Sequence, residues 1–352
     1  MGNEEIIFFE QEIRNEKIRT VYTMIFVVAS FICILQAVFR VPVFYLGNLL
    51  NIEAENFEFN QTLYFYLQPF LSIVLNSVAL FFPFWVFTKL SSFKLKDYFT
   101  KHEDTPFLWK VLSPVAVTGV SIGILYASLI VKNLLIDRGF VFNEEYISTG
   151  NDIFQKIFYL ALFTLIPAFT DELVFRGIVL QFLRKHGVTA AVCISAAICA
   201  FSHISIEKIP YLLIAGLFLG WFYVKTENLK LTVISHMVLN ICMGLINIFR
   251  DTVAEEEFMQ TIQLIAITAF IVGLGAFILL ILKYKFKLQD RQDPENELFK
   301  AKESLTGIFK TFAVYVFIFI TVFQIFFIHV KKPEAEEEEL PGEVVEQVVE
   351  EE

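Results

Sequence analysis

Nine long apolar runs, separated by polar connections, dominate the pattern of hydrophobic and polar positions along this chain. Most of them approach the ~20 residues that an α-helix needs to cross the hydrocarbon core of a bilayer. The pattern therefore predicts an all-α, polytopic membrane helix bundle of about nine transmembrane helices, with possible breaks at Pro83 and Pro167 in the two longest runs. The predicted spans are residues 21–39, 64–87, 111–131, 154–182, 189–206, 209–225, 231–249, 262–282 and 311–330.

Charged residues gather outside these runs and divide the chain into three parts. Residues 1–20 are charged throughout and predict a cytoplasmic N-terminal segment, without the short apolar region and cleavage site of a signal peptide. Residues 21–330 are predicted to form the integral membrane domain. Residues 331–352 carry ten of the glutamates behind the formal net charge of −10, so they predict a disordered acidic tail.

Lysine and arginine are concentrated in alternate connections between the runs. The second connection alone holds Lys89, Lys94, Lys96, Lys101 and Lys110. Because cytoplasmic loops are enriched in these residues, the amino terminus is predicted to be cytoplasmic, and an odd number of spans places the carboxyl terminus outside. The abundance of Phe and Ile fits a bacterial cytoplasmic membrane protein.

Composition narrows the classes of function further. Apolar residues make up 56% of the chain and aromatic residues 16%, and the mean hydropathy of +0.61 exceeds that of a soluble domain. The four cysteines lie in apolar runs, without the spacing of a disulfide framework or a zinc knuckle. P-loop, GxGxxG and HExxH motifs are absent from the sequence, which removes the usual signature of nucleotide-driven transport, and no nucleic-acid partner is expected.

Three ionisable residues interrupt the fourth run: Asp171, Glu172 and Arg176. Charge at membrane depth is costly, so these side chains are expected to face the bundle interior or a water-filled cavity. Glu172 and Arg176 are four residues apart and should pair on one helix face. Asp171 is rotated by about 100° from Glu172, so one acid can brace the site while the other performs chemistry. The spacing leaves open which acid does which.

Two histidines and an asparagine lie in later runs. His203 is near the end of the fifth run, and His236 and Asn240 share one face of the seventh. Such a pair can stabilise one oxyanion, or the histidine can bind a metal that the asparagine helps to orient. Together with the acids, these residues predict a hydrolytic site. The flanking runs carry few polar residues, so function is expected in the middle four helices.

In order and spacing, Asp171-Glu172-x-x-x-Arg176, His203 and His236-x-x-x-Asn240 resemble the CPBP family. This is the family of CAAX proteases and bacteriocin-processing (Abi) proteins. The resemblance covers about 155–245, within a predicted catalytic core at 154–249, and implies an intramembrane endopeptidase of about eight helices.

In that family a glutamate activates water, an arginine braces the acids, and His and Asn stabilise the oxyanion. By position, the resemblance implies these catalytic roles for Asp171, Glu172, Arg176, His203, His236 and Asn240. A Zn²⁺ ion held by Glu172, His203 and His236 is also implied.

The chain differs from the usual family pattern at two positions. Asp171 stands where a glutamate is usual, so either the site is adjusted to the shorter acid or Glu172 takes its role. Cys199 stands where a phenylalanine is usual. Straight helices would keep His203 and His236 apart, so we expect a short fifth helix whose connection at 205–209 dips inward. That connection would complete a cavity lined by Glu172, His203, His236 and Asn240.

Three functions remain open at this stage. A protease would act on a membrane-associated protein or peptide, with the lipid bilayer as its other partner. An inactive relative would serve as a membrane scaffold or immunity protein. A secondary transporter would show paired broken helices and repeated charge motifs, which the sequence does not display.

Overall fold

The computed structural model describes residues 3–49, 58–91, 105–142, 149–285, 306–326 and 330–331. These residues form an all-α bundle, and the short strands β1 (Val141–Phe142) and β2 (Val330–Lys331) pair antiparallel beside it. The predicted acidic tail lies outside the described residues after Lys331. The principal helices are α1 (Asn3–Leu49), α2 (Glu58–Leu90), α4 (Phe107–Ile136), α5 (Ile153–Asp171), η1 (Glu172–Leu180), α6 (Gln181–Arg184), α7 (Val188–Ser202), α8 (Lys208–Thr226), α9 (Leu229–Arg250), α10 (Glu255–Tyr284) and α12 (Phe312–Gln324).

Seven helical segments among the described residues are long and apolar enough to cross a membrane, where the sequence predicted about nine. Each of the other two predicted spans is a shorter apolar helix. The 15 residues of α7 rise only ~22 Å, which is less than the ~30 Å of a hydrocarbon core. The 13-residue α12 is shorter still. The chain is thus built as an integral membrane protein with seven membrane-length helices and two shorter apolar helices among the described residues.

Local signals explain where the central helices begin. Asp152 caps α5, because its side chain accepts hydrogen bonds from the backbone N–H groups of Phe154 and Gln155. In return, the side-chain Oε1 of Gln155 accepts a hydrogen bond from the backbone N–H of Asp152. Asn228 caps α9 by accepting from the N–H of Leu231 at 3.2 Å. These caps fix the start of the two helices that carry Asp171, His236 and Asn240.

The fourth predicted run departs from a plain α-helix at an unexpected place. Both α2 and α5 continue past Pro83 and Pro167, so the breaks considered at these prolines are absent. Instead, the chain turns from α5 directly into η1, a nine-residue π-helix that starts at Glu172. Such i→i+5 segments are rare and occur frequently at functional sites.

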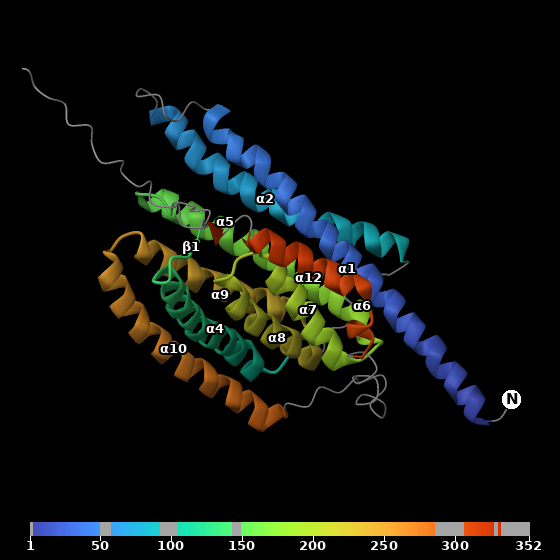
Figure 1. The fold of residues 1–352 in the computed structure, drawn as a ribbon. Coiled ribbons are helices and arrows are strands. Elements are labelled where there is room, and N and C mark those ends of the chain that lie inside the picture. Colours follow the sequence, from blue (N-terminus) through green and yellow to red (C-terminus); the bar gives the residue numbers. More distant parts are fainter. Residues whose placement is uncertain are drawn as a thin grey trace, which may run out of the picture.

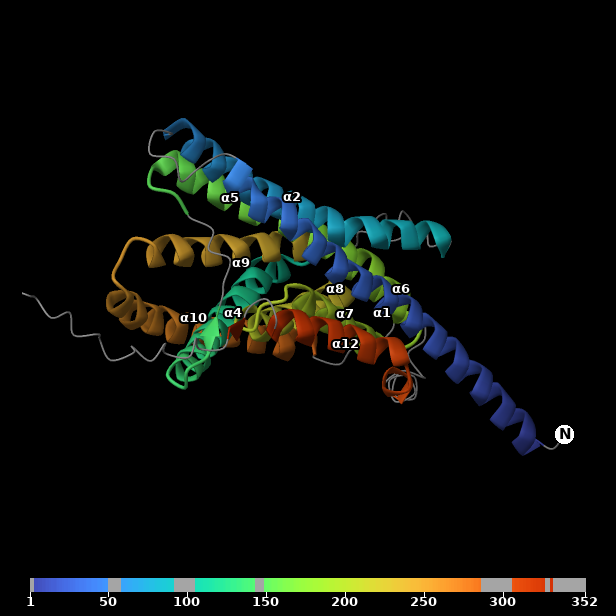
Figure 2. The ribbon, with the colours of Figure 1, turned by 45° about the horizontal axis from the view of Figure 1, so that its top comes forward.

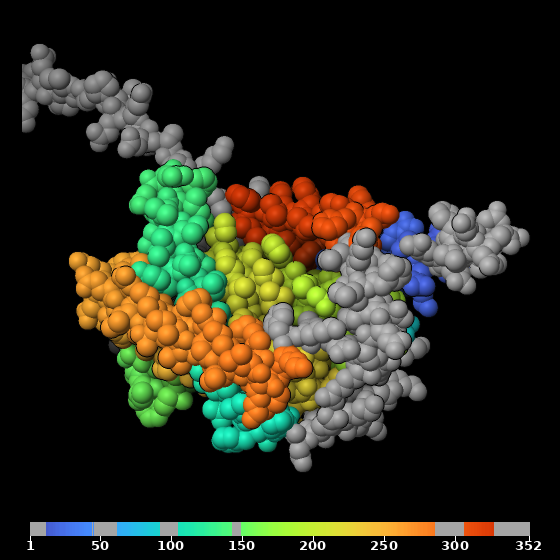
Figure 3. Space-filling model, turned by 90° about the horizontal axis from the view of Figure 1, so that it is seen from below, coloured from blue at the N-terminus to red at the C-terminus, as the bar shows by residue number. Residues whose placement is uncertain are grey.

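The helices pack as a series of neighbours. One group is formed by α1, α2 and α5, and the amino-terminal turns of α1 extend beyond the bundle (Figures 1 and 2). On the other side of α5 the order of contact is α9, α4 and then α10, while α8 joins α4 to α7. Seen from below, α10 lies across α4, with α8 and α12 beside them (Figure 3). In this arrangement the two groups meet where α5 packs on α9, and η1 contacts both of these helices.

Two kinds of packing hold the bundle together. Aromatic rings meet where α4, α8 and α10 converge, with Trp109 5.3 Å from Trp221 and 5.0 Å from Tyr284 between centroids. A second buried cluster surrounds η1, in which Val174, Phe175 and neighbouring apolar residues are fully inaccessible. Large apolar side chains are exposed on the outer faces of α1, α10 and α12, as expected for surfaces that contact lipid.

Candidate active site

The two acids lie at the junction of α5 and η1. Asp171 is the last residue of α5 and Glu172 the first of η1, and their exposed fractions are only 5% and 0%. They are adjacent in the chain but enter different surroundings. Burial of both carboxylates requires partners for each. Arg176 of η1 itself and two histidines from other helices are these partners.

Glu172 is held between a guanidinium and an imidazole. Arg176 Nη1 donates to Glu172 Oε1 at 2.8 Å, so the pair predicted from the four-residue spacing is present. Arg176 Nη2 also donates to the carbonyl of Gly216 at 3.1 Å. A Cβ at Gly216 would lie 2.9 Å from the Cβ of Ala196, so this glycine permits the close packing of α7 on α8 beside the arginine.

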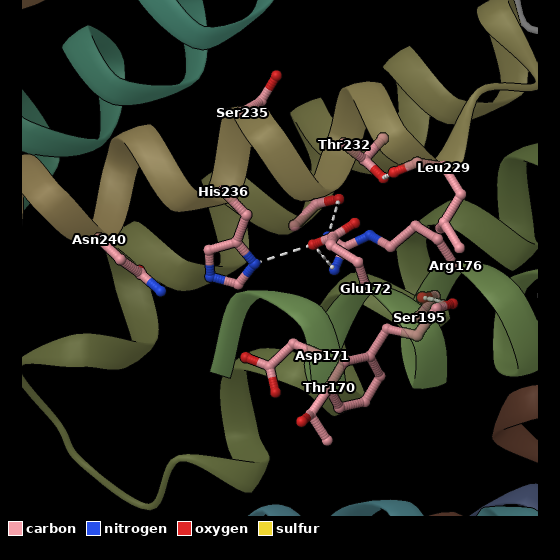
Figure 4. Close-up of polar contacts among 12 residues, drawn as sticks. Thr170, Asp171, Glu172, Arg176, Ser195, Leu229, Thr232, Ser235, His236 and Asn240 are labelled. Carbon is pink, nitrogen blue, oxygen red and sulfur yellow. Dashed lines mark hydrogen bonds and ion pairs between the residues drawn. The ribbon is translucent and has the colours of Figure 1, made fainter. Parts of the chain in front are cut away.

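His236 completes this group from α9. Its Nδ1 lies 3.0 Å from Glu172 Oε1, where an Nδ1–H group donates to the carboxylate. That bond fixes the ring orientation and leaves Nε2 as the second functional nitrogen. Figure 4 shows the ring of His236 between Glu172 on one side and Asn240 on the other. Glu172 and Arg176 thus orient the histidine.

Asp171 faces the other histidine. His203 is the C-cap residue that directly follows α7, and its Nδ1 lies 2.8 Å from the carbonyl of Cys199, which an Nδ1–H group satisfies. Nε2 of His203 is then directed at Asp171 Oδ2, 3.8 Å away. This distance is longer than a direct hydrogen bond, and Asp171 Oδ2 makes none with the described residues.

Asn240 lies one helical turn beyond His236 on α9. Its Nδ2 donates to the carbonyl of Phe163 at 3.3 Å, which uses one of its two N–H groups. In Figure 4 the amide of Asn240 and the outer nitrogen of His236 lie on the same side, near the Asp171 carboxylate. The predicted pairing of His236 and Asn240 on one face therefore gives two polar groups that converge.

A cavity of about 510 Å³ connects these residues. Asp171, His203, His236 and Asn240 line it, which brings together side chains from α5, α7 and α9. The expectation that Glu172 lines the cavity is wrong, because its bonds to Arg176 and His236 hold it behind the cavity wall.

The short α7 and the inward connection after it are present as predicted. Helix α7 ends at Ser202, and Ile204 adopts a positive φ of 50° where the chain turns. Ser205, Glu207 and Lys208 of the connection then line the same cavity as His203. The early end of α7 is what allows His203 and His236 to share one space.

Sequence reasoning missed part of the cavity. The flanking runs were expected to contribute few polar groups, yet Gln36 and Arg40 of α1 and Ser72 and Asn76 of α2 line it. Their four-residue spacing on each helix was a signal that could have revealed a shared face. The expectation that function lies in the middle four helices alone is therefore wrong for the cavity wall.

The described residues do not fit the implied zinc site as they are arranged. Among them, no group of three or more His, Cys, Asp or Glu side chains is disposed to hold a metal ion. Oε1 of Glu172 is occupied by Arg176 and His236, while His203 faces Asp171 instead. Zinc binding stays a prediction of the resemblance, and no chemical step below passes through it.

A comparison with known protein families finds a match to the segment that contains this site. Residues 153–242 match a family model described as type II CAAX prenyl endopeptidase Rce1-like. The matched segment runs from α5 into α9 and contains all six candidate site residues. No curated protein and no solved structure matches the chain.

Proposed function

Because residues 153–242 match the model of the Rce1-like type II CAAX prenyl endopeptidases (CPBP), a protease family, we propose that this protein is a member of that family and an intramembrane endopeptidase. Its substrate is a membrane-associated protein or peptide whose scissile bond enters the cavity between α5, α7 and α9. The observation that carries the proposal is the meeting of Asp171, His203, His236 and Asn240 on one cavity in an otherwise apolar bundle.

Asp171 is the proposed general base. A water molecule between Asp171 Oδ2 and His203 Nε2 could hydrogen-bond to both, since these atoms are 3.8 Å apart and both residues line the cavity. The carboxylate takes one proton as the water oxygen attacks the substrate carbonyl carbon. Proton transfer by a positioned side chain contributes roughly 10²–10⁴-fold to a rate.

His236 and Asn240 stabilise the oxyanion that forms. Asn240 has a second N–H group on Nδ2, and protonated His236 offers Nε2–H, because its Nδ1–H is given to Glu172. When the tetrahedral intermediate collapses, the C–N bond breaks and the proton held by Asp171 passes to the leaving nitrogen. The products are a new carboxyl terminus and a new amino terminus.

Glu172 and Arg176 act as positioning residues. Their ion pair is fully buried, and Glu172 orients the imidazole of His236 through a 3.0 Å contact. The different roles of the two acids follow from their surroundings. Asp171, which lines the cavity, activates water, and Glu172, which does not, orients His236.

The test compares peptide N-termini in membranes from cells that express the wild-type protein and cells that express the Asp171→Asn variant at equal abundance. We expect cleavage products that occur only with the wild type, and these identify the substrate. Identical sets of N-termini, with both proteins folded, would overturn the proposal and favour a non-catalytic membrane scaffold.

A further inference from the structure

The wall that α1 and α2 contribute to the cavity is polar and lies outside the Rce1-like segment. We call Gln36, Ser72 and Asn76 the polar wall. Gln36 belongs to α1, and the other two residues are one turn apart on α2. Helices α1 and α2 pack against each other and α2 packs against α5, so the polar wall borders the same space as Asp171.

Two groups of the polar wall are buried without a hydrogen bond among the described residues. Gln36 and Ser72 have exposed fractions of 9% and 7%, and neither Gln36 Oε1 nor Ser72 Oγ has a partner. Burying an unpaired polar group costs free energy, most of all in an apolar environment. Both residues line the cavity, so a molecule that enters it is placed to supply the missing partners.

Asn76 adds a third polar group at this place. Its Nδ2 donates to the carbonyl of Ser72 at 2.8 Å, which fixes the orientation of the amide within α2. Its Oδ1 remains as an acceptor on a side chain that borders the cavity. The polar wall therefore offers uncharged amide and hydroxyl groups, while Arg40, one turn from Gln36 on α1, adds a charged group to the same side of the cavity.

Uncharged donors and acceptors of this kind match the main chain of a peptide. A peptide presented for cleavage in extended form has no internal hydrogen bonds, so its N–H and C=O groups need partners when water is excluded. We propose that the polar wall binds the main chain of the substrate on the α1–α2 side of the cavity, with Gln36 Oε1 accepting a substrate N–H. This inference rests on the proposed endopeptidase function.

The test uses purified full-length protein in lipid nanodiscs and a synthetic peptide that spans the cleavage site identified in membranes. Matched peptides replace one main-chain amide at a time by an ester, which removes the N–H and keeps the side chains. The variants are Gln36→Leu and the control Val38→Leu, which places the same side chain on the outer face of α1, where Val38 is 54% exposed.

We expect Gln36→Leu to raise KM about fivefold to tenfold, the value of one hydrogen bond of ~1 kcal/mol, while kcat changes less than about twofold. At one ester position the wild type and Val38→Leu should lose affinity by a similar factor, and Gln36→Leu should lose none, because the partner atom is already gone.

Two results would overturn the inference in distinguishable ways. Ester peptides that raise KM equally in the wild type and in Gln36→Leu would remove the polar wall from substrate binding and leave the endopeptidase function intact. A wild-type protein that cleaves no peptide would end both proposals together.

Discussion

Asp171 and Glu172 are separated by one peptide bond and perform different tasks in this account. Glu172 is enclosed by Arg176 and His236, whereas Asp171 borders the cavity opposite His203. The 100° rotation between adjacent helical positions could predict that the acids differ. It could not predict which one faces the cavity, because that depends on where α9 places His236.

The buried ion pair leads to a prediction about stability. Arg176→Met leaves Glu172 without its guanidinium partner, and breaking one side of a buried pair costs roughly 3–5 kcal/mol. The double variant Arg176→Met/Glu172→Gln should lose less free energy of unfolding than the single variants Arg176→Met and Glu172→Gln lose together. Thermal unfolding in detergent, followed by circular dichroism, measures the wild type, the two single variants and the double variant.

A more exposed ion pair serves as the control. Arg184 lies 2.7 Å from Glu227, and both side chains are more exposed than those of Arg176 and Glu172. Arg184→Met should therefore lower the unfolding temperature less than Arg176→Met does. Equal losses, together with additive effects in the double variant, would show that the Glu172–Arg176 pair has no special structural role.

At the scale of elements, the apolar runs predicted the location of the helices well. The hydrophobic signal is strong because each run must satisfy the bilayer along its whole length. The π-helix η1 was not predicted, since its composition is that of an ordinary apolar helix and its hydrogen-bond pattern leaves no clear periodicity. The early end of α7 could be anticipated only from the need to bring two histidines together.

Close packing of α4 and α10 leads to a second prediction. A Cβ at Gly119 would lie 2.8 Å from the Cα of Gly273 and would also meet the carbonyl of Ala269. Since both contacts are backbone, the helices must move apart. Gly119→Ala should therefore destabilise the protein by about 1–3 kcal/mol, measured as a lower unfolding temperature.

Gly275 on α10 provides a matched comparison. A Cβ there meets nothing within 4 Å among the described residues, so Gly275→Ala should be neutral or stabilising by up to ~1 kcal/mol. If both alanine variants unfold at the same temperature, the close approach of the helices at Gly119 is not what stabilises the pair.

Over the whole molecule, the helix ends agree with the predicted orientation. Lys89 is at the end of α2, Lys230 is at the start of α9, and Lys283 is at the end of α10, while three glutamates open α10 at the other end. The positive-inside rule assigns the lysine-bearing ends to the cytoplasm. The orientation stays a prediction from these charges, and seven described helices, where about nine were predicted, are long and apolar enough to cross a membrane.

Cysteine labelling checks this topology. In a protein whose four native cysteines are replaced, Glu256→Cys should react with a membrane-impermeant maleimide in intact cells. Lys230→Cys should react only after the membrane is permeabilised. The opposite pattern of labelling would invert the orientation and place the amino terminus outside.

The proposed endopeptidase mechanism depends on Asp171 as the acid that activates water. The most direct measurement is cleavage of the identified peptide by purified wild-type, Asp171→Asn and Asp171→Glu proteins at equal folded concentration. We predict that Asp171→Asn lowers kcat at least 100-fold, because the base is lost. Asp171→Glu should stay within about tenfold of the wild type, since a longer acid can still reach toward His203 across 3.8 Å. If Asp171→Asn cleaves the peptide as fast as the wild type does, Asp171 is not the general base.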